Sequence, residues 1–427
     1  MNRIEEMIRE LCPNGVEYKQ LGEIGTFVRG NGLQKKDFAD EGVGCIHYGQ
    51  IYTYYNLFTN KTKSCVPPEL AKRLKKAKQG DLVIATTSEN VEDVCKAVAW
   101  LGEEEIAISG DAYIFSHHQN PKYLAYFFSS EYFQEQKKPL VTGTKVMRVS
   151  DRAMSKILLP VPPLAIQNEI VNILDKFTEL EAELEAELEA RRKQYEYYRN
   201  KLLDFNKFGG GYSENVRWYR LGDLGVFYGG LTGKCKSDFT DGNSKFVTYM
   251  NVYSNIAIDI HIHDTVKIAE GERQNKIEYG DVVFTGSSET HDDCGMSSVM
   301  TERPCENLYL NSFCFGFRMY DKTLLLPDFM KFLFRSENIR KQIMKTASGV
   351  TRFNVSKKRF GEIAIPIPPI EDQQRIAAIL DKFETLVNDI SDGLPAEIAA
   401  RRQQYEYYRD KLLTFKHKED GKIQPRS

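Results

Sequence analysis

The sequence predicts a mixed α/β (α+β) protein: two repeated domains separated by two long helices that pack as an antiparallel coiled coil, pseudo-twofold overall. Three observations predict this architecture: the chain repeats itself, each repeat mixes strand-like and helix-like runs, and two long amphipathic stripes follow the repeats. The chain has 427 residues, 41% hydrophobic and 28% charged. That length and composition are sufficient for two globular cores.

The internal repeat extends over most of the chain. LGEIG from Leu21 returns as LGDLG after 200 residues, and GDLVIATTSE from Gly80 returns as GDVVFTGSSE at the same shift. TGTKVMRVS and PVPPLAIQNEIVNILDKF return after 206 residues, and RRKQYEYYRNKLL after 210. The helical segments match best and the domains match only in scattered motifs. Two domains with related jobs on different targets explain this pattern, and so does simple duplication followed by drift.

Within each domain, short runs indicate both strands and helices. Gly80–Ala85 and Gly280–Phe284 have the pattern of a turn followed by a buried strand. Residues 46–55 are rich in β-branched and aromatic side chains, which favours a strand. Residues 121–136 and 327–342 begin with proline and continue with apolar residues at helical spacing, so we expect a helix in each.

Two longer helices follow the domains. Apolar residues spaced by three and four from Ile166 to Leu202 predict a helix of about 39 residues, roughly 58 Å long at 1.5 Å per residue. A similar stripe starts at Ile376 and ends at Leu413, but Gly393-Leu394-Pro395 interrupts it. Because proline removes a helix hydrogen bond, we expect a break or kink there. The two stripes can bury each other as an antiparallel pair.

The composition and the motifs argue against several classes of protein. The N-terminal segment is not a signal peptide, and no run of about 18 apolar residues could span a membrane. Eight cysteines without a C-x-x-C pair are typical of reduced thiols in a cytoplasmic protein. Residues 229–235 (GGLTGKC) resemble a phosphate-binding loop, but the spacing is one residue short and Cys235 replaces the magnesium-binding Ser/Thr. No methyl-donor, nucleotide or metal motif is evident.

Local basic and amide residues are the candidates for nucleic-acid contact, although the net charge is only −2. A dense basic run and repeated glycine-then-basic turns suit phosphates or the guanine edge, while amides suit adenine. A solvated surface, an arginine bound to a carbonyl and an amide that caps the backbone explain the same residues equally well. The DNA-binding candidates are Gln50, Tyr52, Lys72, Arg73, Lys75, Lys76, Lys145, Arg148, Asn251, Tyr253, Arg352, Lys357 and Lys358.

The duplicated segments resemble one family, the specificity subunits of type I restriction–modification enzymes. PVPPLAIQNEIVNILDKF (160–177) and PIPPIEDQQRIAAILDKF (366–383) carry the resemblance, together with RRKQYEYYRNKLLDF (191–205) and RRQQYEYYRDKLLTF (401–415). The domain starts VEYKQLGEIG (16–25) and VRWYRLGDLG (216–225) extend it. The first copy departs from the family pattern, because Ala165 and Ile166 stand where Glu371 and Asp372 stand in the second.

The resemblance implies a division of the chain and a set of partners. Each domain would recognise one half of a bipartite double-stranded DNA site, and each half would recruit one adenine-methyltransferase subunit through the helices. Separate restriction subunits, which translocate DNA and cut it, would complete the enzyme. S-adenosylmethionine, ATP and magnesium would then bind to the partners, and this chain would be non-catalytic without a cofactor of its own. The implied segments are 1–160, target-recognition domain 1; 161–208, spacer helix 1; 209–366, target-recognition domain 2; 367–416, spacer helix 2; and 417–427, a flexible tail.

The resemblance also points to residues that would meet the methyltransferases. They lie at the start and the end of each long helix. The partner-helix candidates are Gln167, Arg191, Arg192, Tyr195, Tyr198, Gln373, Arg401, Arg402, Tyr405 and Tyr408.

The tetrapeptide ELEA, repeated three times over Glu179–Ala190, acquires a possible meaning in this family. Four residues add about 6 Å of helix and DNA rises about 3.4 Å per base pair, so one unit would change the spacing of the half-sites by one to two base pairs. Helix filler without a measuring role remains an alternative. For the whole chain, the alternatives are an enzyme acting alone and an assembly scaffold that does not bind DNA.

Overall fold

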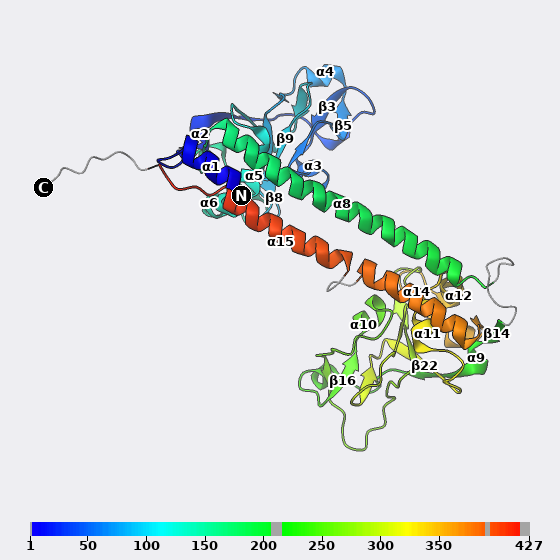
Figure 1. Cartoon of the computed structure of the whole chain (residues 1–427). Helices are drawn as coiled ribbons and strands as arrows, with labels where there is room; N and C mark the ends of the chain where they lie inside the picture. The colour runs from blue at the N-terminus through cyan, green and yellow to red at the C-terminus, as the bar shows by residue number, and fades with distance from the viewer. Residues whose placement is uncertain (1, 206–215, 389–392, 419–427) are drawn as a thin grey trace. The chain divides into compact units, whose positions relative to one another are not determined.

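The computed structural model describes residues 2–205, 216–388 and 393–418 (Figure 1). The chain divides into two compact units, residues 1–185 with 398–427, and residues 186–397. Each unit contains one domain and a segment from each long helical region. Among the described residues, no helix is long and apolar enough to cross a membrane.

The first unit is built on two sheets. A five-stranded sheet has the order β2-β11-β7-β9-β4, and a four-stranded sheet has the order β5-β3-β10-β6. The strands are β2 (Gly25–Arg29), β3 (Val43–Ile46), β4 (Phe58–Thr59), β5 (Ser64–Val66), β6 (Lys76–Ala77), β7 (Leu82–Ala85), β9 (Ala97–Trp100), β10 (Ile106–Ile108) and β11 (Ala112–His117). Two further pairs join β1 (Tyr18–Gln20) to β13 (Leu158–Pro160) and β8 (Thr87–Ser88) to β12 (Met147–Arg148).

The second unit repeats this plan with fewer strands. Its main sheet has the order β15-β22-β18-β20, and its second sheet has the order β17-β16-β21. The strands are β15 (Gly225–Gly229), β16 (Ser244–Val247), β17 (Thr265–Val266), β18 (Val282–Thr285), β20 (Ser297–Val299), β21 (Leu308–Leu310) and β22 (Cys314–Met319). β14 (Arg217–Arg220) pairs with β25 (Ala364–Ile367), and β19 (Ser287–Ser288), β24 (Phe353–Val355) and β23 (Ala347–Ser348) form a third small sheet.

Several short helices connect these strands. They are α1 (Asn2–Leu11), α2 (Leu21–Ile24), α3 (Tyr48–Thr53), α4 (Pro68–Ala71) and α7 (Asp151–Met154) in the first unit, with 3₁₀ turns at Lys35–Asp37 and Lys138–Leu140. The second unit has α9 (Leu221–Leu224), α10 (Tyr249–Ser254) and α13 (Lys357–Phe360), with a 3₁₀ turn at Lys236–Phe239.

The strands predicted at residues 80–85 and 280–284 are confirmed as β7 and β18, both buried along their whole length. The strand predicted over residues 46–55 is wrong, because the chain turns after Ile46 and forms α3. His47 caps this helix by accepting a hydrogen bond from the Gly49 amide at 3.2 Å. Ile51 and Tyr55 lie four residues apart and are both buried, so helical spacing overrides the strand propensity of these residue types.

Each proline-led segment forms two helices instead of the single helix that its apolar spacing suggests. α5 (Pro121–Ser129) and α6 (Glu131–Lys137) meet at Ser130, and α11 (Pro327–Leu333) and α12 (Glu337–Thr346) flank Ser336. Both serines have extended backbones, and the Ser130 hydroxyl caps α6 by accepting from the Phe133 amide. An extended N-cap residue ends one helix where the next one begins.

The first long helix, α8 (Leu164–Leu202), has the predicted 39 residues. The second helical region consists of α14 (Ile370–Asn388) and α15 (Leu394–Leu412), so the predicted break is confirmed. Pro395 lies in the first turn of α15, where a missing N–H leaves no hydrogen bond unmade.

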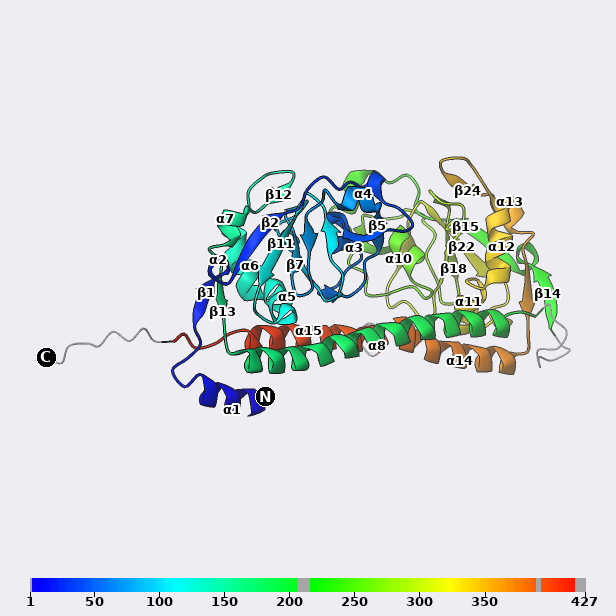
Figure 2. The same cartoon turned by 90° about the horizontal axis from the view of Figure 1, so that it is seen from above.

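Within each unit, α8 packs against the second helical region. In the first unit, Phe177 stacks on Tyr408 at 5.5 Å, and Arg402 Nε donates to Glu181 at 2.8 Å. Residue numbers rise along α8 as they fall along α15, so the two helices run antiparallel. In the second unit, Phe383 of α14 stacks on Tyr198 of α8 at 5.6 Å. Figures 1 and 2 show α8 beside α15 and beside α14.

Each domain covers its helix pair with its proline-led helices. In the first unit, α5 lies between the main sheet and the long helices (Figure 2). The Tyr126 hydroxyl of α5 donates to Asp175 of α8 at 2.7 Å, and its ring lies 6.4 Å from that of Tyr405. The hydrophobic core of this unit accordingly continues from the sheet through α5 into the helices.

Candidate nucleic-acid interface and helix surfaces

A short hairpin projects from each domain and carries the predicted glycine-then-basic turn. Gly143 and Gly349 have φ values of 106° and 150°. A Cβ on Gly143 would lie 2.1 Å from the Val146 carbonyl oxygen, and one on Gly349 would lie 2.0 Å from that of Arg352. Only glycine fits such a close approach in this backbone region. The duplicated glycines are therefore explained by the hairpin.

The basic residues of the two hairpins are not equivalent. Met147 lies opposite Ser88 in the first domain, and Phe353 lies opposite Ser288 in the second. This register places Arg352 at the position of Val146. Arg148 and Arg352, which the sequence analysis treats as one repeated site, therefore occupy positions two residues apart in the hairpins. Lys145, Arg148 and Arg352 are all exposed.

Arg352 lies beside a cleft of about 600 Å³ in the second domain. Its Nε and Nη2 donate to the Ser287 hydroxyl at 3.1 and 3.0 Å, and its guanidinium lies 5.6 Å from the Phe313 ring centroid. Tyr249 and Tyr253 stack at 6.2 Å along another wall. The sequence singled out Tyr253 and Arg352 but not Phe313, because an aromatic residue next to a strand is typical of a core.

The basic run of the first domain follows α4 and continues into β6, so it does not cover one side of a helix. Lys72 pairs with Glu69 at 2.6 Å, and Lys76 approaches Glu105 to 3.8 Å. Arg73 and Lys75 are exposed. Lys357 and Lys358 of the second domain are exposed on α13, where the Lys357 ammonium lies 5.5 Å from the Phe315 ring centroid.

The amide candidates support the backbone. Gln50 is buried; its Oε1 accepts from the His47 amide at 3.0 Å and its Nε2 donates to Ser64 at 2.7 Å. Asn251 donates to the Asp259 carbonyl at 2.9 Å. These contacts correspond to the capping alternative. The Tyr52 hydroxyl donates to the Thr87 carbonyl at 2.7 Å.

The glutamines at the start of the long helices face inward. Gln167 is fully buried: its Oε1 accepts from the Asn120 amide at 3.0 Å, and its Nε2 donates to Gln119 at 2.7 Å and to the Pro162 carbonyl at 2.8 Å. In the second copy, Gln373 Oε1 accepts from the Leu326 amide at 2.9 Å, and Nε2 donates to the carbonyls of Leu324 and Pro368. Both side chains fasten a helix to its own domain and are inaccessible to a partner.

At the other end of each helix, the tyrosines divide into an inner and an outer set. Tyr195 is buried, and Tyr198 and Tyr408 stack on phenylalanines of the neighbouring helix. Tyr197 and Tyr407, which the sequence did not single out, are both 60% exposed. The helical stripe itself signals this difference, because residues 195 and 198 continue it and residue 197 does not.

Three of the four candidate arginines at these helix ends donate to side chains of the long helices. Arg191 donates to Glu187 at 3.0 Å, and Arg402 bridges Glu181 and Glu185. Arg192 is exposed, and Arg401 donates to Gln404 at 3.2 Å.

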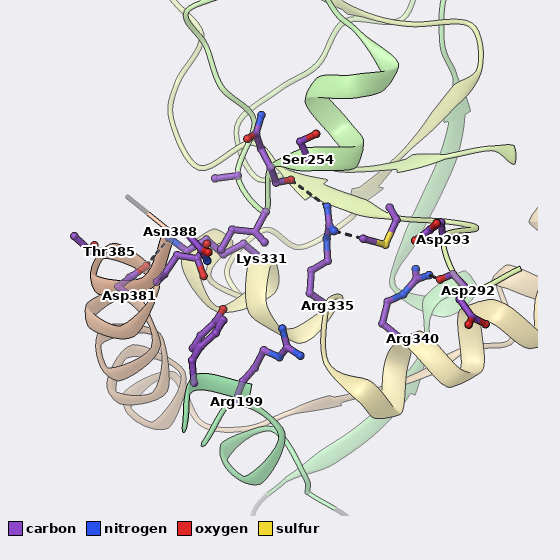
Figure 3. A pocket seen from close by; sticks show the side chains of 16 residues that line it. Arg199, Ser254, Asp292, Asp293, Lys331, Arg335, Arg340, Asp381, Thr385 and Asn388 are labelled. Atoms are coloured by element: carbon purple, nitrogen blue, oxygen red, sulfur yellow. Dashed lines mark hydrogen bonds and ion pairs between the residues drawn. The ribbon is translucent and has the colours of Figure 1, made fainter. Parts of the chain in front are cut away.

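A charged pocket of about 830 Å³ separates the second domain from its helix pair (Figure 3). Arg335 donates from one side to the carbonyls of Ser297, Val252, Tyr253 and Asn255. Burial, with the nearby charges of Arg340 and Arg199, lowers the pKa of Arg335 to about 10. Lys331 pairs with Asp381 of α14 at 2.6 Å, as Lys122 pairs with Asp175 of α8 in the first unit. These contacts make the pocket part of the junction between domain and helices.

Internal contacts engage the loop that resembles a phosphate-binding loop. Lys234 of the loop that resembles a phosphate-binding loop pairs with Glu272 at 2.7 Å and donates to the Lys267 carbonyl at 2.6 Å. Across the described ranges, no group of three or more His, Cys, Asp or Glu residues could hold a metal ion.

Comparison with known proteins identifies a family. A family model described as the type I restriction modification DNA specificity domain matches residues 13–190 and 213–400. The chain is 34% identical over 274 residues to the specificity subunit of the type I restriction enzyme EcoR124I/EcoR124II of Escherichia coli, a match that covers 62% of this chain and 65% of that protein, which is less than two thirds. A putative type I specificity subunit of Haemophilus influenzae, S.HindORF215P, is 31% identical over 285 residues, which cover 65% of this chain and 69% of that one.

Solved structures share the fold. A chain from a study of complex assembly and conformational transition of the type I restriction–modification system superposes with a TM-score of 0.64 at 16% identity, over 93% of this chain and 97% of that one. The S subunit of such a system from M. genitalium gives a TM-score of 0.50 at 14% identity, over 93% and 96%.

Proposed function

Because the chain belongs to the type I restriction–modification DNA specificity family, we propose that it directs a type I enzyme to a bipartite DNA sequence, each domain reading one half. The observation that carries this proposal is the pair of projecting hairpins. They share a glycine-dependent backbone and differ in the side chains at their tips. One framework with two sets of tip residues is what two readers of different half-sites require.

Docking on DNA would begin with the exposed basic residues. Arg73 and Lys75 in the first domain, Lys145 and Arg148 on its hairpin, and Lys358 in the second domain would contact phosphates. Such contacts fix the register of a protein on the duplex and make affinity fall steeply with salt. Base edges would be read from the hairpins in the major groove.

The chemistry would belong to the partners. Each half would hold one adenine-methyltransferase subunit, which binds S-adenosylmethionine and flips the target base out of the helix. Restriction subunits would use ATP and magnesium. The chain itself would contribute no catalytic group.

The long helices would set the distance between the half-sites. The ELEA repeat lies within α8, where each four-residue unit contributes about 6 Å. Removing one unit would also rotate the following segment by about 40°, because four residues overshoot one 3.6-residue turn.

Methylome sequencing of cells that express the chain with its methyltransferase tests the proposal. We expect methyl-adenine in both halves of a split motif, with a gap one to two base pairs shorter in the variant that lacks residues 183–186. A wild-type motif whose gap stays unchanged in the variant would contradict the measuring role only. A methyltransferase that binds the chain but modifies no split motif would favour a scaffold.

A further inference from the structure

The cleft beside Arg352 combines features of a base-reading site. Its exposed surface is unusually apolar, because Met250 and Phe313 are each 58% exposed, and Val350, on the neighbouring hairpin, is 91% exposed. Exposed large apolar side chains that line one cleft together with a guanidinium are uncommon on a protein surface that meets only water. The group therefore indicates a surface that is covered when the protein functions.

The guanidinium of Arg352 is fixed by two hydrogen bonds that leave other N–H donors available. The single Ser287 hydroxyl accepts from both Nε and Nη2, and Ser287 is buried, so the orientation of Arg352 is fixed from below. Of the five N–H donors of an arginine, the two on Nη1 of Arg352 bind no acceptor in the part of the chain that the structure describes, so they remain available to a ligand. A preoriented guanidinium is the commonest protein group for the O6 and N7 acceptors of guanine.

The charges at the rim argue against a phosphate at this position. The exposed carboxylate of Glu289 and the carboxylate of Asp293, which accepts from Thr290 at 2.6 Å, both line the cleft. A phosphate drawn to Arg352 would meet both, whereas an uncharged base edge would not.

The corresponding place in the first domain is different. The matching helix starts, Tyr48 and Tyr249, put Gly49 at the position of Met250. The strand register places Asp111 at the position of Phe313, where it pairs with Arg29 at 3.4 Å. Val146 stands at the position of Arg352. The cleft with its arginine and apolar walls is thus a property of the second domain.

We propose that this cleft determines the sequence of one half-site: Arg352 reads a guanine, the exposed side chains of Phe313 and Met250 contact the methyl group of a neighbouring thymine, and Ser287 positions Arg352. The inference rests on the proposed function and names the residues that give the second domain its specificity. It excludes a role for Arg352 as a phosphate contact.

Methylation rates on a panel of duplexes test the inference. The chain in complex with its methyltransferase is assayed on duplexes in which every base pair of both half-sites is replaced in turn. We expect Arg352→Ala to reduce the preference for guanine at one position of one half-site by about 5- to 150-fold. Preferences in the other half-site should be unchanged, which also shows that the variant is folded.

Further variants separate positioning from packing. Ser287→Ala should weaken the same guanine preference by a smaller factor, and Phe313→Ala should weaken the preference for thymine at an adjacent position. Arg359→Ala is the matched control, because Arg359 is exposed on α13 outside the cleft and should leave every preference unchanged.

Two results would overturn the inference. A uniform loss of rate on all duplexes in Arg352→Ala, with base preferences intact, would make Arg352 a phosphate contact. Preferences and rates equal to wild type would make the cleft irrelevant to recognition. If the wild-type complex methylates no split motif at all, the proposed function fails and this inference fails with it.

Discussion

The two copies differ much less on the surface that holds the long helices than on the surface that carries the hairpin. On the helix side, the copies keep the same anchor: Gln167 and Gln373 each accept from a backbone amide of their own domain and donate to a proline carbonyl at the helix entry. On the hairpin side, Val146 and Arg352 share a position but not a chemistry. The difference indicates that both halves must hold the same structure and read different targets.

Physical constraints explain why the helix side cannot drift. A buried amide must satisfy its donors and acceptor, and each polar group left unpaired by a substitution costs about 1–3 kcal/mol. An exposed side chain at a hairpin tip has no such penalty. Surface residues therefore change without loss of stability and become available for specificity.

The buried glutamines give the largest expected effect. Gln167→Ala and Gln373→Ala should each lower the free energy of unfolding of their own unit by about 3 kcal/mol, since each removes three hydrogen bonds and leaves a buried amide N–H and a carbonyl unpaired. Trp100 and Trp218 lie in different domains, so variants that retain one tryptophan report unfolding in denaturant for each unit separately.

Exposed Gln403→Ala is the control and should change stability by less than about 0.5 kcal/mol. Losses that differ greatly between Gln167→Ala and Gln373→Ala would contradict the equivalence of the two helix surfaces.

A smaller effect should distinguish the two main sheets in acid. Burial lowers the pKa of His117 in β11 to about 4, and its Nε2 has no hydrogen-bond partner among the residues that the structure describes. Met319 occupies the same position in β22, opposite Gly225 as His117 is opposite Gly25. Between pH 6.5 and pH 4, His117 is protonated in the unfolded chain but stays largely neutral in the folded protein. The first unit should therefore lose about 2 kcal/mol as the pH falls through this window.

His117→Met should remove this loss without changing the second unit. The measurement is denaturant unfolding at pH 7 and pH 4.5, followed through Trp100 in a Trp218→Phe background. An unchanged pH dependence in the variant would assign the acid sensitivity to other groups.

The elements that the sequence predicted well are those whose signal is periodic or repeated. The length of α8 follows from its stripe, and the break before α15 follows from Gly393 and Pro395. The strand predicted over residues 46–55 is wrong, because a six-residue helix offers less than two turns of periodicity and its β-branched and aromatic residues favour a strand.

The candidate site was harder to predict, because exposure and register depend on tertiary contacts. Gln50 has the amide side chain that suits adenine, but it is buried and binds the backbone amide of His47. Phe313 resembles a core residue but is exposed. The pairing of Phe353 with Ser288, which places Arg352 in register with Val146, involves a strand more than 60 residues away.

The smallest expected effect concerns an exposed feature that occurs in both copies. Tyr197 and Tyr407 are equally exposed, and each has a lysine within 5.7 Å of its ring centroid, Lys201 and Lys411. Since the same surface occurs once in each unit, we expect each tyrosine to bind one methyltransferase. Tyr197→Ala or Tyr407→Ala should weaken one of two binding steps by about 1–2 kcal/mol, and the double variant should weaken both. Titration of the chain with its methyltransferase by native mass spectrometry measures the two steps.

Tyr198→Ala is unsuited as a control because it also removes the contact with Phe383, whereas exposed Lys193→Ala leaves the helix packing intact. Two unchanged steps in the double variant would move the docking surface away from these helix ends.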